Sequence, residues 1–377
     1  MNAKKLMLVG LPMIAVTYGL SRFSFGLMIP SINETMNIKP TTSGLISSLS
    51  YVAYCIAIVL AMVFSNKITP KSILVIAGFS SIIGLGIIAI SPNPLILGLG
   101  VFLAGMSTGY SSPPYADIVS KNIETQLQNK TNSWINSGTS IGTASTGIIA
   151  LVMADSWRET YVIFMVIAIF VLIGNYLVLP KKQPVEKIST VRFSKKEWKR
   201  ATPLVIASFF IGVACSAYWT FSRDFLVELE SMPVYFKDWL WVIIGISGLL
   251  GGTAGAFIDK FGLTRAYLLS VSALSTSSLI LGLYPGNFLS GFLSPALFGS
   301  SYIFMTAVLI VWGITVFKTN PSFGLGIPFL TLALGQAIGS IFSGIVADLT
   351  GYHVLFIGAS LLGYLTLFLK FKENKFV

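Results

Sequence analysis

Leaving aside residues at segment ends, four charged side chains stand inside the long apolar segments of this sequence: Arg22, Asp117, Arg223 and Asp224. A charge near the centre of a bilayer costs roughly 2.5–3.5 kcal/mol on insertion scales. Residues kept there at such a cost usually face a cavity or a partner. These four residues are therefore the first candidates for a functional site.

Arg22 lies about 16 residues into the first apolar segment, or about 24 Å along a helix axis, which is past the bilayer midplane. A guanidinium group can hold a carboxylate through two parallel hydrogen bonds. We expect Arg22 to bind an anionic substrate, and a structural ion pair with Asp224 is the alternative. Arg223 is a second expected substrate contact, unless its long side chain extends to the membrane interface.

The two aspartates have different expected roles. Asp224 is the carboxylate that could take up and release a proton during a transport cycle. Asp117 stands near the end of its segment, where we expect a structural ion pair with a cytoplasmic loop.

Aromatic side chains precede both arginines by about one helical turn. Tyr18 precedes Arg22, and Tyr218 precedes Arg223. We expect both tyrosines to line the cavity, and packing or a place in the interfacial aromatic belt is the alternative. The run 109–114, GYSSPP, predicts either an irregular helix beside the cavity or a simple proline kink.

Hydrolase and nucleotide-driven chemistry do not fit these segments. Residues 138–142, GTSIG, have the spacing of a nucleophile elbow, but that motif needs a strand–turn–helix setting and a histidine. Here the motif lies in an apolar segment, and the one histidine, His353, stands at a predicted outer loop, at the start of the last segment. No phosphate-binding G-x4-G-K-[ST] run occurs. Cys55 and Cys215 stand in apolar segments without metal spacing, so we expect no enzyme activity, cofactor or metal site.

Composition predicts an integral membrane protein. Hydrophobic residues make up 54% of the chain and charged residues 10%, with a mean hydropathy of +0.81. A soluble domain carries about 25% charged residues. The net charge of +11 does not indicate nucleic-acid binding, because the lysines and arginines gather in loops on one side of the predicted membrane.

Twelve apolar segments are long enough to cross the roughly 30 Å hydrocarbon core as helices. They cover residues 6–30, 42–65, 72–91, 94–120, 133–154, 160–179, 202–226, 238–258, 266–284, 288–316, 323–347 and 352–370. With the N-terminus inside, the inner loops hold 20 lysines and arginines and the outer loops hold 3. This imbalance predicts that both termini are cytoplasmic.

One long polar run, residues 181–201, divides the chain. It carries eight lysines and arginines against two glutamates, and it predicts a basic cytoplasmic linker. The flanking parts, residues 1–180 and 202–377, hold six segments each and predict two bundles.

The two halves repeat one another. The pattern G-x3-G-x4-G occurs in the fifth and eleventh segments, at Gly138, Gly142 and Gly147 and at Gly335, Gly339 and Gly344. Small residues four apart let a neighbouring helix approach closely. The shared pattern predicts an internal repeat, as in carriers built from two related halves.

The loop between the eighth and ninth segments reads G-x3-D-K-x-G-x2-R, with Gly255, Asp259, Lys260, Gly262 and Arg265. Gly255 would let two helices close up, and Asp259 would meet a helix N-terminus or a basic partner. Gly262 would allow a tight turn. This loop resembles the signature cytoplasmic loop of the major facilitator superfamily.

The resemblance covers essentially the whole chain and implies an all-α integral membrane fold, with 12 transmembrane helices in two pseudo-symmetric six-helix bundles. In the family, the matching loop of the first half helps to hold the outward-open state, and here Asn66 stands at its aspartate position. We expect the loop at 255–265 to act as a conformational latch. Drug–proton antiporters of the family usually carry an arginine midway along the fourth segment, and residues 95–121 contain none.

These features predict a carrier that moves a small organic solute, an anionic one, by alternating access. Proton-coupled efflux or exchange is the first hypothesis, and symport uptake of a small organic anion is the alternative. A non-transporting membrane sensor or assembly protein on the same fold is a further alternative. We expect a monomer in the cell membrane, whose partners are the substrate and the lipid bilayer and not nucleic acid.

Overall fold

The computed structural model describes residues 2–64, 67–153, 156–180, 195–229, 234–317 and 321–369. All regular structure within these ranges is helical. Most of the predicted linker, and Asn66 of the degenerate loop, lie outside them.

Six spans make up the N-terminal half. The first span is interrupted in its middle by a π-helical stretch, and the fifth is divided into two helices. In chain order the elements are α1 (Ala3–Ile14), η1 (Ala15–Phe23), α2 (Ser24–Met36), α3 (Pro40–Phe64), α4 (Pro70–Ile90), α5 (Pro94–Asn122), α6 (Thr125–Asn136), α7 (Gly138–Met153) and α8 (Trp157–Val178).

The C-terminal half also has six spans, and its second span contains a short 3-10 stretch. Its elements are α9 (Lys195–Glu228), α10 (Val234–Gly248), η2 (Leu249–Thr253), α11 (Ala254–Phe261), α12 (Leu263–Leu283), α13 (Phe288–Val316), α14 (Pro321–Thr350), α15 (Tyr352–Leu365) and η3 (Thr366–Phe368). Because α9 begins at Lys195, residues 195–201 of the predicted linker belong to this helix.

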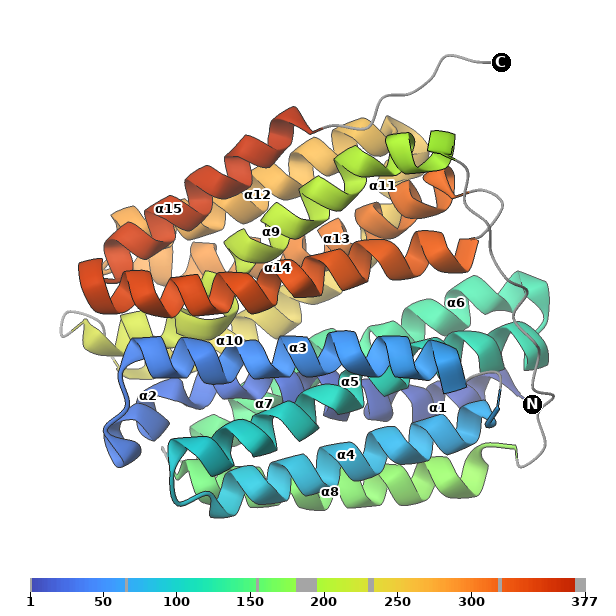
Figure 1. Cartoon of the computed structure of the whole chain (residues 1–377), viewed down its shortest axis with the longest axis horizontal. Helices are drawn as coiled ribbons and strands as arrows, with labels where there is room; N and C mark the ends of the chain where they lie inside the picture. The colour runs from blue at the N-terminus through green and yellow to red at the C-terminus, as the bar shows by residue number, and fades with distance from the viewer. Residues whose placement is uncertain are drawn as a thin grey trace.

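Within the described ranges, ten spans are long and apolar enough to cross a membrane. The other two are α7, which packs on η1 and α10, and α15 with η3, which packs on α12. Figure 1 shows the N-terminal half, in blue to green, and the C-terminal half, in yellow to red, lying side by side. The prediction of an all-α membrane fold with two six-helix bundles is confirmed.

We call the end of the molecule that holds the turns at 37–39, 91–93 and 351 the outer end, following the charge-based prediction, and the opposite end the inner end. Local signals set several helix ends. Thr69 and Asn93 each accept a hydrogen bond from a backbone N–H three residues on, directly before a proline that starts α4 or α5. Gly262 (φ 85°) and Gly351 (φ 86°) supply the left-handed turns after α11 and α14.

The glycine repeat packs α7 and α14 onto the first span of their own halves. A Cβ at Gly142 would lie 2.3 Å from the carbonyl oxygen of Ala15 in η1. A Cβ at Gly339 would lie 2.7 Å from the carbonyl oxygen of Val213 in α9. Equivalent helices therefore meet in both halves, as the internal repeat predicts.

The third glycine of each pattern packs across the boundary between the halves. A Cβ at Gly147 of α7 would lie 2.9 Å from the backbone nitrogen of Val242 in α10. A Cβ at Gly344 of α14 would lie 2.5 Å from the carbonyl oxygen of Pro40 in α3. These backbone contacts join the halves toward the outer end.

The hydrophobic core also runs across that boundary. One cluster joins Phe23 and Ile29 of the first span to Trp219 of α9 and Trp241 of α10. A second cluster lies within the N-terminal half alone and includes residues of α1, α4, α5 and α8 near their inner ends. The two halves therefore pack together at the centre and the outer end.

We expect Gly142→Ala to lower the thermal stability of the purified protein, because the added methyl group would meet the backbone of Ala15 rather than a movable side chain. Overpacking of this kind costs roughly 1–3 kcal/mol. Gly174→Ala in α8 is a matched control, since nothing lies within 4 Å of its Cβ position. Melting temperatures in detergent check the prediction. Equal melting temperatures for the two variants would contradict the close packing of α7 on η1.

Candidate functional site

The π-helical stretch η1 positions the central arginine and holds both Tyr18 and Arg22. The hydroxyl of Thr17 donates to the carbonyl oxygen of Met13 (3.0 Å), and the hydroxyl of Thr108 in α5 donates to the carbonyl oxygen of Thr17 (3.0 Å). Side-chain donors that compete for helix carbonyls loosen the α-helical pattern. π-Helical turns occur frequently at functional sites.

The guanidinium group of Arg22 is buried at the boundary between the two halves. Its Nη2 donates a hydrogen bond to Oε1 of Gln336 in α14 (3.1 Å). Its Cζ lies 4.8 Å and 4.4 Å from the ring centres of Tyr51 and Tyr54 in α3. Among the described residues its Nε has no hydrogen-bond partner, and no carboxylate lies within 4.0 Å. The site therefore holds a positive charge without a counter-charge, and a spare donor.

The C-terminal half supplies the facing wall. Nε2 of Gln336 donates to the hydroxyl of Tyr302 (3.1 Å) and to Sγ of Cys215 (3.6 Å). The ring of Trp219 stacks on Phe23 with centres 4.0 Å apart, and the ring of Tyr302 stands edge-on at 5.2 Å from Trp219. Amide and aromatic groups from both halves thus surround the guanidinium.

The two tyrosines expected to line the cavity have different surroundings. Tyr18 is half-buried, its hydroxyl lies 2.9 Å from Oγ of Ser112 in α5, and its ring centre lies 6.3 Å from that of Phe23. Tyr18 is therefore beside the site. Tyr218 is fully buried within the C-terminal half, with its hydroxyl 2.8 Å from Oγ of Ser294 and its ring stacked on a phenylalanine of α13. This geometry favours packing for Tyr218, whose substrate contact stays a prediction.

Arg223 joins the two halves near the outer end. It is buried, and its Nη1 donates to the carbonyl oxygen of Leu27 in α2 (2.7 Å). On the same side, the hydroxyl of Thr41 in α3 donates to the carboxylate of Asp348 in α14 (2.7 Å). Because the Arg223 side chain is buried, it does not extend to the membrane interface. A substrate contact for Arg223 stays a prediction.

Asp224 lies in the same outer contact. Its carboxylate accepts hydrogen bonds from the hydroxyl of Tyr352 (2.5 Å) and from Nδ2 of Asn33 in α2 (3.4 Å). The ion pair with Arg22 that the sequence left open is not formed, because the two side chains have separate partners. We call the contacts of Arg223, Asp224 and Asp348 with the N-terminal half the outer seam.

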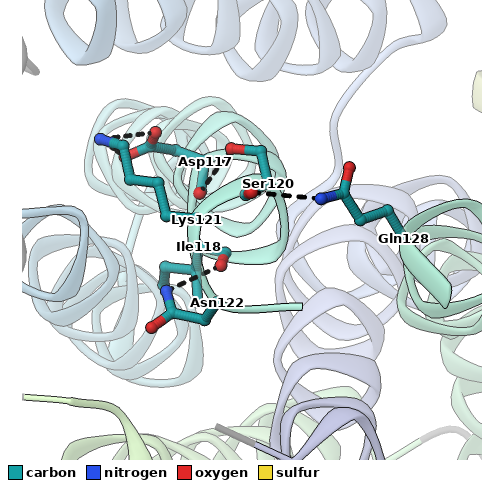
Figure 2. Close-up of polar contacts among 6 residues, drawn as sticks. All are labelled: Asp117, Ile118, Ser120, Lys121, Asn122 and Gln128. Atoms are coloured by element: carbon teal, nitrogen blue, oxygen red, sulfur yellow. Dashed lines mark hydrogen bonds and ion pairs between the residues drawn. The ribbon is translucent and has the colours of Figure 1, made fainter. Parts of the chain in front are cut away.

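Asp117 forms a structural ion pair, as expected, but its partner lies in its own helix. One carboxylate oxygen is 2.9 Å from Nζ of Lys121, one turn later, as Figure 2 shows. Beside this pair, Nε2 of Gln128 in α6 donates to the carbonyl oxygen of Ser120 (3.1 Å). Its second bond goes to the carbonyl oxygen of Ile123 (2.9 Å). These contacts lie at the inner end of α5 and connect it to α6.

The loop that resembles the family signature lies between α11 and α12. The left-handed φ of Gly262 confirms the tight turn. The close helix packing expected at Gly255 is wrong for this conformation, because nothing lies within 4 Å of a Cβ built there. Asp259, Lys260 and Arg265 are exposed.

The partner expected for Asp259 is also absent among the described residues. No basic group lies within 4.0 Å of its carboxylate, and the N-terminus of α12 has no side-chain cap. The described residues therefore show no partner for the predicted latch, and its role stays a prediction.

In the degenerate copy of that loop, Lys71 has a role that the sequence did not indicate. Its side chain is buried, and Nζ donates to the carbonyl oxygens of Tyr176 (2.5 Å) and Leu179 (2.8 Å). A cation at these carbonyls stabilises the C-terminal end of α8.

Two central features were not predicted from the sequence, the π-helical η1 and the hydrogen-bonded Gln336. The signal for Gln336 is a polar amide in an apolar segment, within the glycine repeat at Gly335 and Gly339. The run 109–114 lies in an unbroken α5. The irregular backbone at the site therefore belongs to the first span rather than the fourth.

Comparison with known proteins agrees with this architecture. Residues 13–327 match the Major Facilitator Superfamily. The chain is 24% identical over 390 residues to the hexuronate transporter of Bacillus subtilis (strain 168), covering 95% of this chain and 91% of that protein.

Two solved structures show the same fold. A POT family transporter in complex with 5-aminolevulinic acid is similar with a TM-score of 0.80 at 14% identity, covering 97% of this chain and 94% of that chain. The xylose transporter XylE from E. coli, in a partially occluded inward open conformation, gives 0.74 at 13% identity, covering 98% of each chain. Since the family match spans most of the sequence, the chain belongs to the Major Facilitator Superfamily and is a multi-pass membrane transporter of small solutes, not an enzyme.

Proposed function

We propose that this transporter carries a small organic anion with a carboxylate group, and that Arg22 binds the carboxylate. The supporting observation is the buried guanidinium, which donates to a neutral amide and faces aromatic rings. A carboxylate offers that guanidinium a charged acceptor, which makes a stronger hydrogen bond than an amide does. Nε lies in the same plane as the Nη atoms, so a two-point contact is available.

A sugar acid is the substrate class that suits the surroundings of Arg22. The rings of Tyr51, Tyr54 and Trp219 offer apolar faces for a carbon skeleton, and Tyr302 offers a hydroxyl for the substrate's own hydroxyl groups. Similarity to a hexuronate transporter along 95% of the chain supports the same class. Glucuronate is therefore the first probe, and glucose is its neutral counterpart.

Transport proceeds by rocking of the two halves around this site. Two observations support the proposal: hydrogen bonds of the outer seam join the two halves, and among the described residues Asp259 of the loop at 255–265 has no basic partner. A latch that stabilises the outward-open state is not expected to be engaged in a conformation whose outer end is closed. We place the protein in the cell membrane as a monomer with both termini cytoplasmic.

Arg22→Lys should weaken glucuronate binding by about tenfold or more, or roughly 1.4 kcal/mol. The reason is that lysine keeps the charge but loses the planar pair of donors. Thermal-shift titration of the purified protein measures the affinity, and glucose should produce no shift. Arg158→Lys is the matched control, because Arg158 donates to the carbonyl oxygen of Ser91 at the outer end (2.7 Å). Equal affinities in the parent and Arg22→Lys would rule out the carboxylate contact.

We further propose proton coupling through Asp224. Of the two directions that the sequence left open, its place in the outer seam favours symport uptake over efflux or exchange. Burying a carboxylate costs less when the group is neutral. A proton taken from the outer side would therefore make it easier to close the seam over Asp224.

In proteoliposomes, acid outside should raise glucuronate uptake by the parent protein. Asp224→Asn imitates the protonated carboxyl, so it should reduce this pH-driven uptake several-fold and keep counterflow at equal pH. Asp348→Asn is the matched control, because Asp348 is an exposed carboxylate of the same seam. Uptake driven by acid inside would instead indicate efflux or exchange. Absence of counterflow in the parent would favour the non-transporting sensor.

A further inference from the structure

One hydrogen bond crosses the boundary between the halves at the centre of the site, from Nη2 of Arg22 to Oε1 of Gln336 (3.1 Å). Both residues are buried, and Gln336 is 0% exposed. Water does not compete for this bond. Among the described residues, the amide oxygen of Gln336 is the hydrogen-bond acceptor of the guanidinium in this conformation.

The orientation of the Gln336 amide is fixed by chemistry. Arginine can only donate hydrogen bonds, so the oxygen of the amide must face Arg22. The amide NH2 group then faces the hydroxyl of Tyr302 (3.1 Å) and Sγ of Cys215 (3.6 Å), both of which can accept. One orientation of the amide therefore satisfies all three hydrogen bonds.

Each partner of the bond is attached firmly to its own half. A Cβ at Gly212 of α9 would lie 3.0 Å from the backbone nitrogen of Gln336, so α9 and α14 are in close contact at this level. On the other side, a Cβ at Gly19 of η1 would lie 2.2 Å from the backbone of Gly142 in α7. The hydrogen bond between Arg22 and Gln336 therefore ties one half to the other.

We propose that Gln336 is a built-in competitor of the substrate. In the empty transporter its amide oxygen occupies the place on Arg22 that the substrate carboxylate takes, and it holds the halves together at the centre. This inference rests on the proposed function, since it requires an anionic ligand at Arg22. A bound carboxylate displaces the amide and releases the tie between the halves, so occupancy of the site is linked to movement.

The strength of the hydrogen bond to Arg22 explains why glutamine suits position 336. A neutral amide is a weaker acceptor than a carboxylate, so an incoming anion can displace it. A glutamate at this position would hold Arg22 in an ion pair that the substrate must break. An apolar side chain would leave Arg22 free for the substrate. Without substrate, the two halves would then lack this hydrogen bond between them.

The first test compares glucuronate affinities of purified variants by thermal-shift titration. Gln336→Met removes the competing acceptor at similar volume and should tighten binding by about tenfold or more, the range expected for one hydrogen bond with a charged donor. Gln336→Glu should weaken binding by about tenfold or more, because the competitor becomes charged. Gln128→Met is the matched control and should leave the affinity unchanged. Among the described residues, the Gln128 amide bonds only the carbonyls of Ser120 (Figure 2) and Ile123, at the inner end of the molecule.

The second test needs no ligand. Spin labels at positions 90 and 354, which are exposed at the outer ends of α4 and α15, report the separation of the halves in the empty protein. Gln336→Met should shift the distance distribution toward longer values, and Gln336→Glu should not. Tyr302→Phe keeps the ring but removes the acceptor that orients the amide, so it should lengthen the label distances as Gln336→Met does, by a smaller amount.

The outcomes separate the inference from the proposed function. If the parent binds no carboxylate while Gln336→Met still lengthens the label distances, the tie between the halves stands and the substrate class is wrong. If the parent binds glucuronate and Gln336→Met weakens that binding, Gln336 is a direct substrate contact and the competitor role is overturned. Unchanged affinity and unchanged distances in Gln336→Met overturn it as well. Should Gln336→Met fail to fold, the label distances in Tyr302→Phe decide the matter: longer distances support the tie between the halves, and unchanged distances overturn it.

Discussion

An uncompensated positive charge in an apolar interior is the constraint around which this transporter is arranged. Arg22 lies buried where the two halves meet, and in the part of the chain that the structure describes, its guanidinium contacts neutral groups: one amide oxygen and the faces of aromatic rings. Cation–π contacts and a hydrogen bond to a neutral acceptor reduce the cost of burying the charge. They do not cancel the charge itself, so the site remains attractive to an anion.

Close backbone contacts at glycines hold the helices of each half together. The same glycine pattern fixes α7 on η1 and α14 on α9 within the halves, and its last glycine packs across the boundary at the outer end. Rigid units that meet through a few small residues can separate without disturbing their own cores. The polar contacts of the outer seam and the bond from Arg22 to Gln336 then decide how easily the halves part.

Much of this architecture was readable from the sequence, because membrane folding depends on strong and simple signals. Apolar length predicted the spans, and the glycine spacing predicted close helix contacts at the fifth and eleventh segments. The cost of a buried charge singled out Arg22. The hydrogen-bond partners of Arg223 and Tyr218 could not be predicted, because equal sequence spacing in the two halves does not determine which face of a helix meets the boundary. Arg223 bonds a backbone carbonyl, and Tyr218 packs inside its own bundle.

Gln336 escaped prediction for a related reason: its importance depends on a contact between distant parts of the chain, and a neutral amide carries no charge signal in an apolar segment. The most direct measurement of the account is a structure of the protein with glucuronate bound. The account predicts a carboxylate oxygen within hydrogen-bond distance of the Arg22 guanidinium, with the Gln336 amide oxygen displaced from it. Glucuronate bound elsewhere, with the bond from Arg22 to Gln336 intact, would contradict it.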